Sequence, residues 1–68
     1  MISTTEARRL ISGTRDISEE DQQRLYEWYW AANYAPSPIV QDLRIQVSRR
    51  LDIEAEKERA TRIQEVQK

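Results

Sequence analysis

All five aromatic residues of this 68-residue chain lie in one nine-residue window, at Tyr26, Trp28, Tyr29, Trp30 and Tyr34. Aromatic side chains bury more apolar area than any others, so a core must use this window or leave part of it as a binding surface. A chain of this length buries only about 60% of its unfolded surface, which makes its stability marginal without help. The window therefore indicates both where the core lies and where a binding surface is to be sought.

The chain contains neither cysteine nor histidine, and only one glycine and two prolines. Without cysteine there are no disulfides, thiolate metal sites or cysteine nucleophiles, and without histidine the commonest general base is missing. We expect no enzyme, no cofactor and no metal site. The scarcity of glycine and proline and the abundance of helix-forming residues favour an all-α fold. Self-association or a partner protein remains as the means to stabilise so small a core, and we expect a homo-oligomer, with a dimer favoured.

Capping and stop signals divide the chain into three predicted helices, over about residues 4–12, 18–34 and 38–66. Ser3 and Glu6 form a capping box for the first helix, and we expect Gly13 to end it in a left-handed conformation. Ser18 is the N-cap of the second helix, and the three acidic residues that follow it favour the positive end of the helix dipole.

The two prolines separate the second helix from the third. The second helix should stop before Pro36, because a residue that precedes proline is pushed out of the α region. Ser37 then caps a third helix with Pro38 at its first position. At 1.5 Å per residue this helix would be about 45 Å long, against about 25 Å for the second. We expect one domain over residues 1–68, with a short first helix on an antiparallel hairpin and a third helix that projects at its C-terminus.

Apolar residues that recur at helical spacing predict the core. They are Leu10, Ile11, Leu25, Trp28, Tyr29, Ala32, Val40, Leu43, Val47 and Leu51. Thr14 to Ile17 are expected to form only a short connection between the first two helices.

A second aromatic face lies on the second helix, where Tyr26, Trp30 and Tyr34 follow one another at i, i+4 and i+8. This face is roughly 150° from the core face of Leu25 and Trp28. Two interpretations stay open: the first helix covers the second face, or the face remains exposed as a homo-oligomer seam or a docking site. Tyrosine and tryptophan are enriched at interface hot spots, and the first helix has little apolar area to offer.

Charge is unevenly distributed although the net charge is only −1. Arg44, Arg49 and Arg50 stand against a single aspartate between residues 36 and 51. We expect a non-catalytic protein–protein interaction module, with the aromatic face as its contact and these arginines steering an acidic partner. Such a chain suits accessory, adaptor or inhibitor roles in bacteria or their phages.

The predicted location is the cytoplasm, without contact to a membrane. The longest uncharged run, residues 28–41, is broken by both prolines and is too short to span a bilayer. No basic segment followed by an apolar stretch opens the sequence, so nothing indicates export.

The alternative function is a small dimeric DNA-binding transcriptional regulator that uses the arginines of the third helix. The negative net charge and the lack of a tight helix-turn-helix turn speak against nucleic acid without excluding it.

Residues 54–68 allow two interpretations of their own. They form a frayed helix end or a coiled-coil arm in an assisted dimer. Ile53, Ala60 and Val66–Gln67 lie near one heptad position, and Glu56 and Ile63 lie at the other. This seam covers under two heptads, whereas three to four are wanted.

Overall fold

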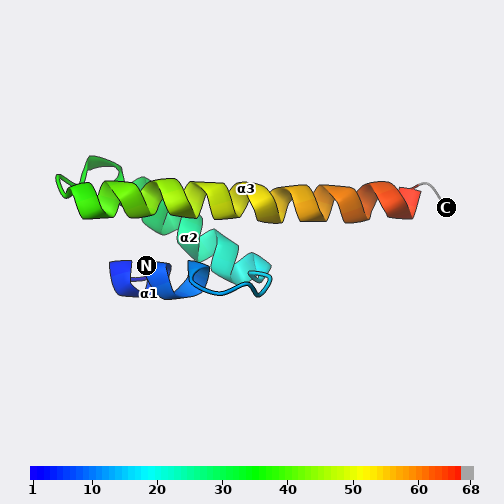
Figure 1. The fold of residues 1–68 in the computed structure, drawn as a ribbon, viewed down its shortest axis with the longest axis horizontal. Coiled ribbons are helices and arrows are strands. Elements are labelled where there is room, and N and C mark those ends of the chain that lie inside the picture. Colours follow the sequence, from blue (N-terminus) through cyan, green and yellow to red (C-terminus); the bar gives the residue numbers. More distant parts are fainter. Residues whose placement is uncertain (67–68) are drawn as a thin grey trace.

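A computed structural model describes the backbone of residues 1–66 and the side chains of residues 1–62. Its elements are α1 (Thr4–Ile11), α2 (Glu19–Ala31), the 3₁₀ turn η1 (Ala32–Tyr34) and α3 (Pro38–Val66). In Figure 1, α2 runs obliquely back along the first half of α3, α1 packs beside them, and the second half of α3 extends beyond both. The predicted all-α fold, a short first helix on a hairpin with a projecting third helix, is confirmed.

The three predicted N-caps are present. The hydroxyls of Ser3, Ser18 and Ser37 each accept a hydrogen bond from the backbone amide three residues further on, at 3.1, 3.2 and 3.4 Å. The carboxylate of Glu6 accepts a hydrogen bond from Arg9 at 2.8 Å, rather than one from the Ser3 amide as in a complete capping box. Short-range hydrogen bonds of this kind fix where each helix begins.

The first helix does not end through a left-handed glycine, so that prediction is wrong. Helix α1 ends at Ile11, and Gly13 does not have a positive φ. Ser12 ends the helix instead, because its amide and its hydroxyl both donate to the Arg9 carbonyl, at 3.3 and 2.8 Å. These two bonds satisfy a terminal carbonyl that the left-handed glycine was expected to serve.

The end of α2 is held by a side chain of α3. After Ala31 the helix tightens into η1, and its last carbonyls need partners. The side-chain amide of Gln41 donates to the carbonyls of Ala32, Asn33 and Ala35, at 3.2, 3.3 and 2.9 Å. Gln41 in the first turn of α3 therefore binds the carbonyls of η1 and of the residue that follows it.

The buried core comprises Ala7, Ile17, Leu25, Trp28, Leu43, Val47 and Leu51. Five of these seven belong to the predicted core, and the other predicted members pack against it partly buried. Ile17 was expected only in a connection, yet it is 7% exposed. The indole N–H of Trp28 donates to the hydroxyl of Thr4 at 3.4 Å, which joins α2 to α1.

Arg50 fastens the connection between α1 and α2 onto α3. Its guanidinium donates to the carbonyl of Gly13 at 2.6 Å and to the carbonyl of Arg15. It also pairs at 3.3 Å with Glu54, the only buried charged residue among the described side chains. A buried carboxylate without a partner would cost several kcal/mol, so this pair and the connection depend on each other.

Beyond Glu54 the described side chains of α3 leave the core, and Lys57 reaches back to Asp16 of the α1–α2 connection at 2.9 Å. Every residue from 55 to 62 is exposed, and Arg62 pairs with Glu58 at 3.3 Å, as the i, i+4 spacing predicts. In the part of the chain that the structure describes, no helix combines the length and the apolar character that a membrane span requires.

Candidate docking surface

Tyr26, Trp30 and Tyr34, named here the aromatic ridge, are exposed. The exposed fractions are 47%, 64% and 90%, so the structure shows the open form of the second aromatic face. At about 150–250 Å² per fully exposed aromatic residue, the ridge presents roughly 300–500 Å² of mainly apolar surface. Patches of this size on a small monomer are often functional. Helix α1 does not cover the ridge because it packs on the Trp28 side of α2.

Tyr29 holds the ridge in place. The rings of Tyr29 and Trp30 meet edge to face, with centroids 5.5 Å apart. The Arg44 guanidinium stacks on the Tyr29 ring at 4.2 Å, and its Nε donates to the Tyr29 carbonyl at 3.0 Å. Trp30 is therefore fixed on one side by a ring that α3 immobilises, which lowers the entropy that binding would cost.

The structure separates the three arginines that the sequence grouped as partner-binding residues. Arg44 donates to Gln41 at 2.8 Å in addition to its contacts with Tyr29, and Arg50 binds the α1–α2 connection. Arg49 is exposed and forms no ion pair within residues 1–62. Two of the three guanidinium groups thus hold the fold together.

A hollow of about 140 Å³ adjoins the ridge, where α2 meets α3. It is lined by Tyr26, Tyr29, Ser48, Leu51 and Asp52, and we call it the Tyr26 notch. Sequence analysis missed Ser48 and Asp52. Each follows a buried apolar residue of α3 by one position, which places it on the flank of the core stripe.

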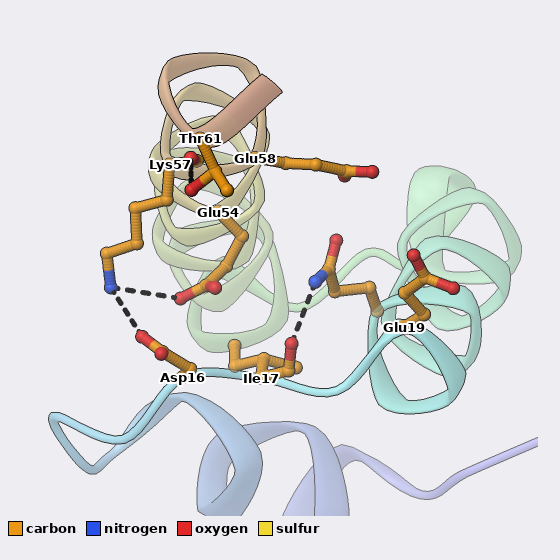
Figure 2. Close-up of a pocket in the computed structure, with 8 residues that line it drawn as sticks. Asp16, Ile17, Glu19, Glu54, Lys57, Glu58 and Thr61 are labelled. Carbon is orange, nitrogen blue, oxygen red and sulfur yellow. Dashed lines mark hydrogen bonds and ion pairs between the residues drawn. The ribbon is translucent and has the colours of Figure 1, made fainter. Parts of the chain in front are cut away.

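A second hollow, of about 220 Å³, lies between the α1–α2 connection and α3 (Figure 2). The Lys57 ammonium reaches Asp16 at 2.9 Å and Glu54 at 3.6 Å. The Lys57–Asp16 hydrogen bond lowers the pKa of the Asp16 carboxyl and raises the pKa of Lys57. Within the described residues no cluster of acidic, histidine or cysteine side chains could hold a metal ion. The one lysine of this hollow is engaged in ion pairs that pin the connection to α3.

The residues predicted for self-association lie on α3. Ile53 is 48% exposed and Ala60 is also exposed. The side chains of Ile63 and Val66, and residues 67–68, fall outside the described part of the structure.

The fold and this surface define a small three-helix domain with one uncovered aromatic face. Comparison with protein families, with curated proteins and with solved structures finds no match for this chain. The side chains of the surface are therefore the basis on which a function can be inferred.

Proposed function

We propose that this chain is a non-catalytic protein–protein interaction module that binds a segment of another protein along the aromatic ridge. The observation that carries the proposal is the exposure of three large rings along α2 and η1, at 47%, 64% and 90% for Tyr26, Trp30 and Tyr34. Tyrosine and tryptophan at such positions provide large contact area at low conformational cost. An accessory, adaptor or inhibitor role in the cytoplasm fits a chain that has no cysteine.

The size of the ridge favours a single helix or extended peptide of the partner. A standard interface buries about 800 Å² on each side, and the ridge offers roughly 300–500 Å². A short segment laid across three rings suits that area better than the broad face of a globular protein. Binding of this kind is reversible, as adaptor and inhibitor roles require.

The DNA-binding alternative is less well supported. It needs free arginines on α3, but Arg44 and Arg50 already donate to carbonyls of α2 and of the α1–α2 connection. A gel shift on random duplex DNA at low salt tests it directly, because phosphate contacts give an affinity that falls with salt by about 0.9 log units per log unit for each phosphate.

The proposal is tested by capture from extracts of the native host with the tagged chain, its Trp30→Ser variant and its Ile39→Gln variant. Ile39 is 67% exposed and lies outside the ridge, so it is a matched control. Capture that survives Ile39→Gln and disappears with Trp30→Ser supports the proposal. A partner retained equally by all three proteins contradicts it.

Solution mass separates a foreign partner from a second copy. Light scattering after size exclusion, over a hundredfold concentration range, tests the dimer expected from the sequence, and a monomer would leave the ridge free for a foreign partner. A dimer that Trp30→Ser dissociates would mean that the ridge is a self-association seam. A dimer that only Ile53→Gln dissociates would assign self-association to α3 instead.

A further inference from the structure

We infer that the partner segment carries a lysine or arginine that inserts into the Tyr26 notch, beside the apolar residues that cover the ridge. This inference rests on the proposed function and adds the chemistry of the partner. The partner inferred here is basic, whereas the arginines in the sequence suggested an acidic partner. The difference arises because Arg44 and Arg50 are engaged within the fold.

The lining of the Tyr26 notch suits a cation on an aliphatic stem. Asp52 provides a carboxylate, Ser48 a hydroxyl, and Leu51 an apolar wall that is 4% exposed. The ring of Tyr26, which is 47% exposed, can accept a cation over its face. Long basic side chains bury their stem along apolar surface and keep the charged end near a polar group, which is the arrangement that this notch offers.

Two carboxylates beside the ridge have no cation paired with them. Asp52 lies in the notch, and Glu27 lies one helical turn before Trp30. Neither forms an ion pair with any side chain of residues 1–62. Each of these two carboxylates is therefore available to a basic group of a partner.

The nearby arginines leave the Asp52 carboxylate unpaired within residues 1–62. Arg44 precedes Asp52 by eight residues, about 12 Å along α3, which exceeds the Debye length of about 8 Å at physiological salt. It also stacks on Tyr29, which leaves the Tyr26 ring to a ligand. Arg49 is the nearest exposed cation on α3, and it makes no ion pair with Asp52 in the structure.

A second copy of this chain is a poorer occupant. In a two-fold interface the same patch meets itself, so a ridge-to-ridge dimer would bring Glu27 and Asp52 of both copies to one seam. Like charges at an interface cost free energy. The ridge also has less area than the roughly 800 Å² per partner of a stable interface.

The test uses three tripeptide probes: acetyl-Leu-Arg-Leu-amide and its counterparts with neutral citrulline or with glutamate in the middle. Binding is followed by amide chemical shifts of the labelled full chain, up to roughly 10 mM peptide because so few contacts give weak affinity. We expect the arginine peptide to bind tightest and to shift residues around Tyr26 and Asp52.

Variants assign the effect to the notch. Asp52→Asn should weaken the affinity for the arginine peptide about two- to fivefold, as for the loss of an exposed ion pair. The affinity for the citrulline peptide should not change. Asp42→Asn, the same charge change about 15 Å away on α3, should leave both peptides unchanged. Arg49→Gln should keep or strengthen binding of the arginine peptide. Unchanged thermal midpoints check that each variant is folded.

Each other outcome overturns the inference. Equal binding of the arginine and citrulline peptides, or no binding of the arginine peptide, means that the Tyr26 notch does not select a cationic side chain. Tighter binding of the glutamate peptide, lost in Arg49→Gln, means an acidic partner. None of these results affects the proposed function, which fails separately when Trp30→Ser leaves capture of the native partner intact.

Discussion

Trp28 and Trp30 stand two residues apart on α2, yet 3% of the first and 64% of the second is exposed. At 100° per residue they point about 200° apart, so one helix presents one tryptophan to each side. Helix α1 covers the Trp28 side and gives the indole N–H a hydroxyl partner in Thr4. The same side chain thus serves as core or as surface according to which element lies opposite it.

The two sides of α2 also differ in what holds them. On the covered side, Arg50 binds carbonyls of the α1–α2 connection and Glu54 is buried with it. On the open side, Arg44 binds the Tyr29 carbonyl and stacks on its ring, but nothing closes over Trp30. An arginine of α3 therefore stabilises each side of α2. Only Arg50 also holds a segment, the α1–α2 connection, against the domain.

The largest expected effect is on the covered side. Trp28→Ala should destabilise the domain by about 3–5 kcal/mol, because it removes a large buried ring and leaves a cavity. A domain this small has little more stability than that, so the variant should be largely unfolded. Far-UV circular dichroism and urea denaturation measure this. A wild-type midpoint would mean that α1 does not cover this face in solution.

The next largest effect is expected where Arg50 attaches the α1–α2 connection to α3. Arg50→Gln should cost about 1–3 kcal/mol, since it removes hydrogen bonds to the connection and leaves the buried Glu54 carboxylate without its guanidinium partner. Chemical denaturation gives the value. The double variant Arg50→Gln/Glu54→Gln should be less destabilised than the sum of the single variants. Strict additivity would show that the two residues act independently.

On the open side the effect on stability should be small. Trp30→Ser should change the free energy of unfolding by less than about 1 kcal/mol, because the variant loses only an exposed edge-to-face contact with Tyr29. Urea denaturation beside Trp28→Ala makes the comparison direct. If Trp30→Ser unfolds the domain, the ridge belongs to the core, and loss of partner capture by this variant would carry no information about binding.

The sequence predicts what depends on neighbours along the chain and misses what depends on a distant element. The serine caps and the core stripe of α3 are local patterns, and Ser3, Ser18 and Ser37 act as predicted. The burial of Ile17 is not local, because the connection that contains it is held by Arg50, more than thirty residues away.

The candidate site shows the same limit. The spacing of the ridge could be read from the sequence, but its exposure depends on which side of α2 the first helix covers. The roles of Arg44 and Arg50 were not predicted because their acceptors are backbone carbonyls, which every residue carries and no side-chain pattern reveals. Asp52 was missed because only the docking of α2 brings Tyr26 beside it.

The smallest effect concerns the edge of the covered side, where Lys57 binds Asp16 beyond Arg50. The lowered pKa of Asp16 means a stabilisation that is present above its unfolded pKa and is lost as the pH falls through the folded value. The raised pKa of Lys57 means a stabilisation that is present below its unfolded pKa and is lost as the pH rises through the folded value.

Lys57→Gln should therefore lower the thermal midpoint slightly at pH values between the pKa of Asp16 and the pKa of Lys57. The difference from wild type should vanish in acid, where Asp16 is protonated, and in strong base, where Lys57 is neutral. Added salt should shrink it as well, because both groups are exposed and salt screens them. Arg62→Gln is the control, since it removes a cation of the projecting half of α3 that pairs only within its own helix. A Lys57→Gln difference that persists in acid would mean that the aliphatic stem of Lys57, rather than its charge, holds the connection against α3.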